Sequence, residues 1–183
     1  MKIGVISDTH GNIAALDKAL GNLEGADLIV HAGDVLYHPP KLGWIDGYDI
    51  PGFVERLNHL EIPIVIAQGN CDAQVYEELL NIPVQSPYAL VEFEGIRIVA
   101  NHGHLLSRSR MIDVARRYKA DYFISGHTHI PALERVDGIT LMNPVSPAIS
   151  NYEVNGRSIP TVGIITESGA RIVNIEDGST VQE

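Results

Sequence analysis

Residues 2–23, KIGVISDTHGNIAALDKALGNL, place a strand, a tight turn and a helix one after another. The segment KIGVIS is short, apolar and β-branched, as buried strands are. Four apolar residues then recur at helical spacing, at Ile13, Leu16, Leu20 and Leu23. A strand that leads directly into a helix is the first part of a crossover unit in a parallel sheet.

The alternation of strands and helices continues to residue 81. The predicted strands are DLIVHAG (27–33) and IPIVIAQ (62–68), and the predicted helices are FVERLNHL (53–60) and AQVYEELLN (73–81). Their apolar residues follow the periods of strands and helices respectively. Because such alternation requires crossover connections, we expect a mainly parallel sheet.

After residue 85 the pattern changes to hairpins. YALVEFEGIRIVANHG (88–103) predicts two strands about Glu94-Gly95, and later turns fall at Asp137-Gly138 and Ser168-Gly169. A helix at 110–120 and a strand at 121–125 lie between them. These hairpins predict a second, largely antiparallel set of strands packed on the first sheet. Since no linker or repeat separates the halves, we predict one domain over residues 1–183.

The composition, with 45% hydrophobic and 20% charged residues, is that of an ordinary globular domain. A formal net charge of −10 argues against extended nucleic-acid binding, which requires clustered Lys and Arg. The apolar run before Asp8 is too short for a signal sequence or a membrane span, and a single cysteine cannot form an internal disulfide. We therefore expect a cytoplasmic protein that contacts no membrane.

Polar side chains that can bind a metal follow five of the predicted strands. They are Asp8 and His10, Asp34, Asn70, His102 and His104, and His127 and His129. Because open α/β sheets bind ligands at the carboxyl ends of their strands, these side chains should converge on one rim. Carboxylate, imidazole and amide ligands suit Mn²⁺, Fe²⁺ or Zn²⁺, and this many candidates would be enough for two ions.

Each of these motifs alone is weak, because His and Asp near strand ends often cap turns or satisfy backbone groups. Their recurrence at five strand ends favours one metal site. His31, within a predicted strand, and His59, on a predicted helix, fit packed or solvated roles, and His38 is left open. The long irregular segment 36–52, with Trp44, is either a packed surface loop or a lid or subunit contact.

In their order along the chain, these motifs resemble those of the calcineurin-like metallophosphoesterase superfamily, in its small prokaryotic phosphodiesterase branch. The motifs are SDTHGN (7–12), GDV (33–35), GNCD (69–72), HGH (102–104) and SGHTH (125–129), and the likeness reaches about residue 147. The resemblance implies an α/β fold, a four-layer αββα sandwich of two mixed β-sheets flanked by helices. It also implies metal-dependent hydrolysis of small phosphodiesters with two divalent ions, expected to be Mn²⁺, with Zn²⁺, Fe²⁺, Co²⁺ or Ni²⁺ as alternatives.

The resemblance also implies two ligand sets that share Asp34. One ion would be held by Asp8, His10, Asp34 and His129, and the other by Asp34, Asn70, His102 and His127. A water or hydroxide between the ions would then be the nucleophile, because coordination lowers its pKa. The histidines need acceptors for their second ring nitrogen, which the sequence does not identify.

Cys71 departs from the pattern of many relatives, which have a histidine there that stabilises the transition state or protonates the leaving oxygen. A neutral thiol is a weak donor, so we predict modest turnover and a preference for good leaving groups. The candidate catalytic residues are Asn70, Cys71, Asp72 and His104. His104 either replaces the missing imidazole or supports the ligands. Cys71 could alternatively be a small buried filler or a redox-sensitive thiol.

A second departure is Val145, in MNPVSPA (142–148), where relatives commonly have glycine. Because a β-branched residue rarely tolerates a positive φ, we expect the turn to avoid that conformation here.

Two alternatives to the phosphodiesterase stay open. Some eukaryotic relatives act as interaction scaffolds in membrane-trafficking complexes, having lost site histidines that this chain keeps. A phosphomonoesterase or nucleotidase is the other alternative. A homo-oligomer, either a dimer or a tetramer, is a further expectation.

Overall fold

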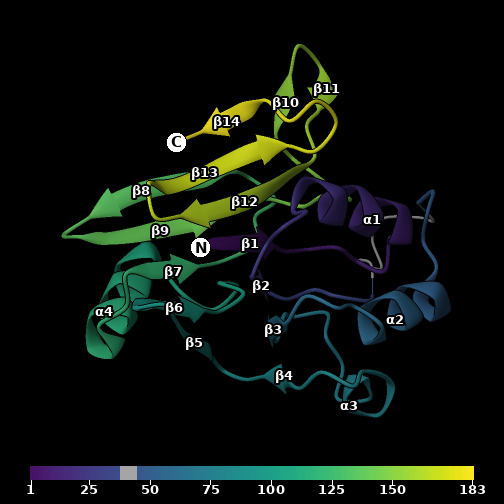
Figure 1. Cartoon of the computed structure of the whole chain (residues 1–183), viewed down its shortest axis with the longest axis horizontal. Helices are drawn as coiled ribbons and strands as arrows, with labels where there is room; N and C mark the ends of the chain where they lie inside the picture. Colours follow the sequence, from purple (N-terminus) through teal and green to yellow (C-terminus); the bar gives the residue numbers. More distant parts are fainter. Residues whose placement is uncertain (38–44) are drawn as a thin grey trace.

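The computed structural model describes residues 1–37 and 45–183, which form two β-sheets between helices (Figure 1). The larger sheet has, from edge to edge, β14 (Thr180–Gln182), β13 (Gly169–Asn174), β12 (Thr161–Thr166), β1 (Lys2–Ile6), β2 (Leu28–His31), β3 (Ile64–Ala67) and β4 (Val84–Gln85). The smaller sheet has β5 (Ala89–Phe93), β6 (Ile96–Ala100), β7 (Tyr122–Ile124), β9 (Ile139–Asn143) and β8 (Ala132–Val136). A separate hairpin pairs β10 (Glu153–Val154) with β11 (Arg157–Ser158).

The helices are α1 (Ile13–Asn22), α2 (Ile50–Asn58), the short α3 (Tyr76–Leu79) and α4 (Arg108–Tyr118). Two of these helices begin at a polar N-cap residue. Asn12 accepts a hydrogen bond from Ala15 N at the start of α1, and Ser107 accepts one from Arg110 N at the start of α4. Figure 1 shows α1 and α2 on one side of the strands and α4 on the other.

Three apolar clusters fill the three interfaces between the layers. One joins α1, α2 and α3 to the larger sheet, one lies between the two sheets, and one joins α4 to the smaller sheet. Leu16, Ile98 and Phe123, one from each cluster, are at most 1% exposed. The predicted four-layer αββα sandwich is therefore confirmed.

The placement of the last hairpin differs from the prediction. β12 and β13 join the first sheet, where β12 lies antiparallel to β1, instead of the second sheet. The apolar run TVGIIT fits this position, because β12 lies inside the larger sheet with five of its six residues buried. The smaller sheet is in turn mixed, since β6–β7 and β7–β9 are parallel pairs.

Several boundaries also differ from the prediction. The helix expected at 73–81 is limited to α3, because Leu80 has an extended backbone. α2 begins three residues earlier than expected, at Ile50, where Asp49 caps it and accepts a hydrogen bond from Gly52 N. His38 and Trp44, and with them most of the predicted lid or subunit contact, lie outside the described residues.

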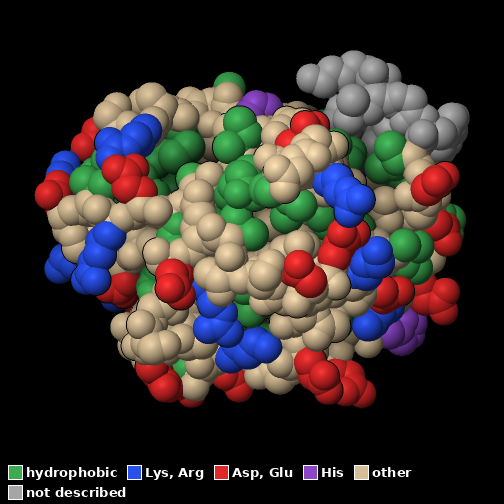
Figure 2. All heavy atoms as spheres, turned by 90° about the horizontal axis from the view of Figure 1, so that it is seen from above, with side chains coloured by type: hydrophobic (Ala, Val, Ile, Leu, Met, Phe, Trp, Pro, Cys, Tyr) green, Lys and Arg blue, Asp and Glu red, His purple; other side chains and the backbone are tan. Residues whose placement is uncertain are grey.

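Among the described residues, no helix is long and apolar enough to cross a membrane. Figure 2 shows one face of the molecule, on which Lys and Arg side chains are interspersed with Asp and Glu. On that face there is no continuous basic track of the kind that an extended nucleic acid requires.

Candidate metal centre

The carboxyl ends of β1, β2, β3, β6 and β7 carry the predicted ligands, as the strand pattern requires. Backbone hydrogen bonds join the first two of these loops, from Asp8 N to Gly33 O (2.9 Å) and from His10 N to Asp34 O (3.0 Å). The backbone N–H of His127, from the other half of the chain, donates to Asp8 Oδ2 (3.0 Å), so the structure brings residues from both halves to one place.

Two carboxylates lie at the middle of a group of three buried histidines. Asp8 Oδ1 lies 3.1 Å from His129 Nε2 and 3.8 Å from His102 Nε2. Asp34 Oδ2 lies 3.2 Å from His102 Nε2 and 3.9 Å from His10 Nε2. Because Asp34 contacts a histidine from each implied ligand set, its position fits a shared ligand. Asp8 also reaches members of both sets.

The three buried histidines use the other ring nitrogen, Nδ1, to bond a backbone carbonyl. His10 bonds Tyr37 O (2.6 Å), His102 bonds Ala32 O (2.9 Å) and His129 bonds Ile149 O. A carbonyl can only accept, so Nδ1 carries a proton, and it is Nε2 that keeps the lone pair for a cation when the ring is neutral. These carbonyls are the acceptors that the sequence did not identify, and they aim each Nε2 at Asp8 and Asp34.

The donor set fits a divalent metal. His102 Nε2 is buried and makes no hydrogen bond within the described part of the chain, although Asp34 Oδ2 lies close to it. Asp8, His10 and His129 each offer a ligand atom within 4.8 Å of the others, and so do Asp8, Asp34 and His102. Buried imidazole nitrogens gathered around two carboxylates, with one of them unpaired, are the arrangement that a cation completes.

The remaining predicted ligands lie less deeply. His127 and Asn70 are exposed. The His127 ring lies edge-on to His102 with centroids 5.3 Å apart, while the Asn70 amide donates to Cys71 Sγ at 3.2 Å. His104 lies beside the cluster, 5.6 Å from His102 between ring centroids, and its buried Nδ1 has no hydrogen-bond partner among the described residues.

Cys71 is half-buried at the edge of the cluster. Its backbone N–H donates to Asp34 Oδ1 (2.8 Å), and its Sγ lies within 4.8 Å of ligand atoms of His10 and Asp34. Burial, together with the negative charge of Asp34, raises the pKa of the Cys71 thiol to about 12. Without a bound cation the residue is therefore a neutral thiol, which is a weak proton donor.

Asp72 connects two loops of the site. Its carboxylate accepts from three backbone amides, Asp34 N (2.9 Å), Val35 N (2.7 Å) and Gly69 N (2.7 Å). Burial raises the pKa of the Asp72 carboxyl to about 6, although the three donors favour the charged form. This geometry favours a positioning role for Asp72 over direct contact with a substrate.

The histidines also control the charge of the two central carboxyl groups. Burial opposes ionisation of Asp8 and Asp34, but the charge of the neighbouring histidines, which are protonated in the absence of a cation, outweighs it, together with hydrogen bonds from Ser7 Oγ to Asp8 and from Cys71 N to Asp34. The pKa of each carboxyl is consequently lowered. Both are therefore carboxylates, the form that binds a cation, across the neutral pH range.

Five of the seven predicted ligands have a left-handed backbone. The φ angles are 55° at Asp8, 47° at His10, 57° at Asp34, 70° at His127 and 56° at His129. Residues in this region are uncommon and cluster at functional sites, because the surrounding structure must hold them there. The sequence analysis did not predict that the ligands themselves adopt this conformation.

Two of the glycines are required for close approach instead of for a turn. A Cβ atom on Gly69 would lie 2.1 Å from Asp34 Oδ1, and one on Gly126 would lie 2.0 Å from Ser7 Oγ and 2.6 Å from Asp8 Oδ2. Any side chain at these positions would displace the central carboxylates.

The expectation for Val145 was wrong, since its φ is 71°. Its N–H donates to Asn143 Oδ1 (2.9 Å), and the next residue, Ser146, donates from its hydroxyl to Asp8 O (2.6 Å). The same hydroxyl accepts from Ile149 N (2.7 Å). This network fixes the turn and overrides the preference of valine. The sequence analysis missed Asn143 and Ser146 as supports of the site, although the polar residues of MNPVSPA signal a turn.

His31 supports the site without facing it, and its predicted packed role is confirmed. Its Nε2 lies 2.9 Å from Thr9 Oγ1, and its Nδ1 accepts from Gly33 N (3.1 Å). Burial lowers the pKa of His31 to about 3, so the ring is neutral. His59 is exposed at the end of α2 and bonds only Glu55 O among the described contacts.

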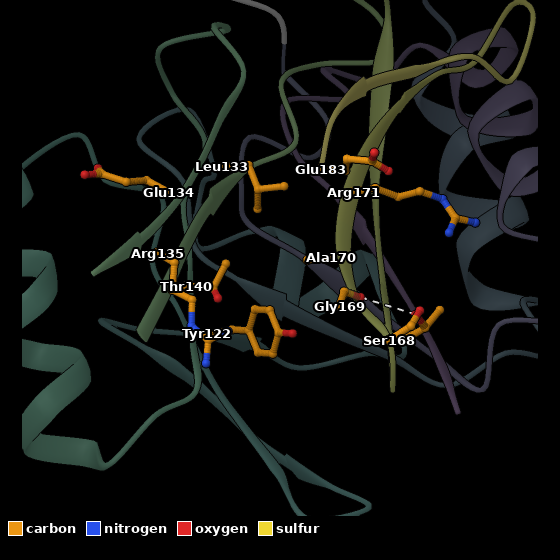
Figure 3. A pocket seen from close by; sticks show the side chains of 11 residues that line it. Tyr122, Leu133, Glu134, Arg135, Thr140, Ser168, Gly169, Ala170, Arg171 and Glu183 are labelled. Atoms are coloured by element: carbon orange, nitrogen blue, oxygen red, sulfur yellow. Dashed lines mark hydrogen bonds between the residues drawn. The ribbon is translucent and has the colours of Figure 1, made fainter. Parts of the chain in front are cut away.

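A separate cavity of about 440 Å³ lies between the two sheets, at Tyr122, Leu133, Ala170 and neighbouring residues. Figure 3 shows Tyr122 and Leu133 directed towards it, while the Arg171 side chain points away. No predicted ligand lines this cavity, so it is distinct from the histidine cluster.

A family model described as the calcineurin-like phosphoesterase superfamily domain matches residues 1–166. The chain therefore belongs to the calcineurin-like phosphoesterase superfamily. It is 30% identical to Phosphodiesterase YfcE of Escherichia coli over 185 residues, which cover 100% of this chain and 97% of the relative. The solved structure of YfcE superposes with a TM-score of 0.84, over 99% of this chain and 97% of that one.

Two further likenesses extend the comparison to other organisms. Phosphodiesterase MJ0936 of Methanocaldococcus jannaschii is 30% identical over 173 residues, covering 90% of this chain and 92% of the relative. The structure of Vps29 from Entamoeba histolytica is 20% identical with a TM-score of 0.66, over 100% of this chain and 97% of that one. At that identity the Vps29 likeness shows the fold alone.

Proposed function

We propose that this chain is a metal-dependent phosphodiesterase that hydrolyses small phosphodiesters at a dinuclear centre. The observation that carries the proposal is the pair of ionised carboxylates, Asp8 and Asp34, each in contact with buried histidines whose Nε2 atoms face them. The full-length likeness to two proteins named as phosphodiesterases supports the substrate class.

Divalent ions bound there would polarise the phosphoryl group and acidify a water molecule. Asp34 would be the shared ligand, and Asp8, His10, Asn70, His102, His127 and His129 would complete the two sets. Mn²⁺ is the proposed ion, because carboxylate and imidazole ligands suit it, with Zn²⁺, Fe²⁺, Co²⁺ or Ni²⁺ as alternatives.

The protein's own contribution is to hold these ligands in place before the substrate arrives. Backbone carbonyls bond Nδ1 of His10, His102 and His129 and so orient their Nε2 atoms towards the two carboxylates. Asp72 fixes the backbone of the Asp34 loop against the Gly69 loop, which sets the spacing of the two sites. Such preorganisation supplies positioning, a major part of catalysis of phosphoryl transfer.

The proposal also covers the domain organisation, the cellular location and the size of the substrate. We infer one domain over residues 1–183, since the three apolar clusters are contiguous layers of one sandwich. A cytoplasmic location is supported by the single free cysteine, Cys71. Small diesters are favoured over long nucleic acids by the net charge of −10.

The test is hydrolysis of bis(p-nitrophenyl) phosphate by protein stripped of metal and then supplied with Mn²⁺. Activity should appear only with the metal and should vanish in Asp34→Asn. A matched control is Asp17→Asn, because Asp17 is an exposed carboxylate whose partner is Arg56 on the surface. If none of Mn²⁺, Zn²⁺, Fe²⁺, Co²⁺ and Ni²⁺ supports turnover, the phosphodiesterase proposal is overturned and a scaffold is favoured. If p-nitrophenyl phosphate is hydrolysed faster than the diester, a phosphomonoesterase is favoured.

A further inference from the structure

Two large apolar side chains stand exposed on the loops that carry histidines of the site. Leu105 is 83% exposed and Ile130 is 54% exposed, and they are the two most exposed large hydrophobic residues of the described chain. Each immediately follows a histidine of the site, since Leu105 follows His104 and Ile130 follows His129. We call this pair the apolar rim.

The fold does not require these two side chains. Leu106, the neighbour of Leu105, is half-buried and packs against the cluster under α4, so it anchors this loop. Leu106 N also donates to Gly103 O at 3.1 Å, which closes a turn behind Leu105. Ile130 is outside all three apolar clusters. Neither side chain belongs to an apolar cluster of the described residues, so both are available to contact a ligand.

Hydrogen bonds hold the backbone of the rim in place. Ile130 N lies 3.3 Å from Thr128 Oγ1, and the Thr128 carbonyl accepts from Asn151 Nδ2 at 3.1 Å. Asn151 N also donates to His129 O at 2.9 Å. Ile130 is thus held on a fixed loop, so little conformational entropy would be lost when a ligand binds against it.

The geometry of the reaction indicates which part of a diester would reach the rim. In-line displacement places the attacking and leaving oxygens on opposite sides of phosphorus, so the leaving group points away from the floor of the site. The ester group that stays on phosphorus would then extend sideways, where the loops that flank the histidine cluster could contact it. We propose that Leu105 and Ile130 bind this retained ester group and select for apolar, aryl-sized substituents; the inference rests on the proposed phosphodiesterase function.

The test compares two diesters with the same leaving group, phenyl p-nitrophenyl phosphate and methyl p-nitrophenyl phosphate. In the wild type, kcat/KM should favour the phenyl diester. In the double variant Leu105→Ser/Ile130→Ser that preference should fall about tenfold, the low end of the discrimination by an apolar contact. The fall should come from a higher KM for the phenyl diester, with unchanged kcat and unchanged metal content.

The matched control is Leu90→Ser, because Leu90 is 49% exposed on the edge strand β5 and pairs with Val99, which packs under α4. Its phenyl-to-methyl preference should equal that of the wild type. An unchanged preference in the double variant would overturn the proposal, and so would an equal loss of activity on both diesters.

A second measurement separates failure of the rim from failure of the proposed function. If the wild type hydrolyses neither diester, the proposed function fails, and binding to the Mn²⁺-loaded protein is read by calorimetry. Diphenyl phosphate should then bind more tightly than dimethyl phosphate to the wild type, and the double variant should lose this difference. No difference would overturn the rim. A wild-type oligomer that the double substitution dissociates, seen by light scattering, would also overturn it, because the rim would then be a subunit interface.

Discussion

Asp72 Oδ2 accepts a hydrogen bond from the backbone amide of Asp34 at 2.9 Å, and the same oxygen accepts from Gly69 N at 2.7 Å. One buried carboxylate atom therefore sets the distance between the loop that carries Asp34, the proposed shared ligand, and the loop that carries Asn70. Asp72→Asn replaces a carboxylate oxygen by a donor, so one or more of the amides loses its acceptor. We expect a loss of about 1–3 kcal/mol in the free energy of unfolding, measured in urea, and a lower kcat.

The control for this substitution is Asp17→Asn, which changes the same side chain where it pairs with Arg56 on the surface. It should leave both the free energy of unfolding and kcat within experimental error, since exposed ion pairs contribute little. If Asp72→Asn behaved like this control, the positioning role of Asp72 would be refuted.

Metal binding should raise thermal stability. A ligand at about 100 times its dissociation constant stabilises the folded state by about 2.7 kcal/mol. We therefore expect Mn²⁺ to raise the Tm of the stripped protein, and Asp34→Asn to abolish most of the rise. The Tm is measured by differential scanning calorimetry with and without Mn²⁺. An equal rise in Asp34→Asn would show that the cation binds elsewhere.

Cys71→His should increase turnover. The thiol is neutral because burial raises its pKa to about 12, whereas an imidazole at this edge of the cluster could donate a proton or a positive charge. We expect kcat for bis(p-nitrophenyl) phosphate to rise about tenfold, less than the roughly 10²-fold of a well-positioned acid. Cys71→Ser keeps the size without the imidazole and should show no rise. A loss or no change in Cys71→His would count against the missing-acid interpretation.

His31 should make the stripped protein less stable in mild acid. Its pKa is about 3 in the folded protein because it is buried, against 6.5 ordinarily. Between these two values the unfolded chain binds a proton that the folded protein does not, so stability falls as the pH drops from about 6.5 towards 3. The slope from this group approaches about 1.4 kcal/mol per pH unit.

The variant His31→Gln lacks the titrating group but keeps an amide that can bond Thr9. Urea denaturation at several pH values should show that the free energy of unfolding falls less steeply with decreasing pH in the variant than in the wild type. Parallel curves for the two proteins would show that His31 does not titrate as its burial implies.

The sequence predicted the family and the layered fold, because both depend on short-range signals. Apolar runs mark β1, β2 and β3, and the motifs that end them identify the superfamily. Which sheet the 161–177 hairpin joins depends on long-range pairing of β12 with β1, and a hairpin turn carries no information about that partner. The two-residue strand β4 and the hairpin β10–β11 are too short for any period to appear.

Within the site, the residue types were predictable and their supports were not. The side chains of Asp8 and His102 are named by their motifs, whereas the acceptors of the histidines are backbone carbonyls, which every residue has. Tyr37 and Ile149 supply two of these carbonyls, and no sequence pattern distinguishes them. The conformation of Val145 was likewise set by a bond from its N–H to Asn143 Oδ1, and Asn143 is itself fixed by donating from Nδ2 to Gly126 O, far away in the sequence.

Because the predicted ligands have a left-handed backbone, the stability of the metal-free protein and its capacity to bind a cation favour different residues at these positions. His127 is exposed and has a φ of 70°, so its conformation costs free energy that no apolar burial of its own side chain offsets. Glycine adopts the same φ without that cost. Selection for the stability of the metal-free protein alone would therefore favour glycine at this position, and the resulting variants would lose one proposed ligand and with it the stabilisation that a bound cation gives.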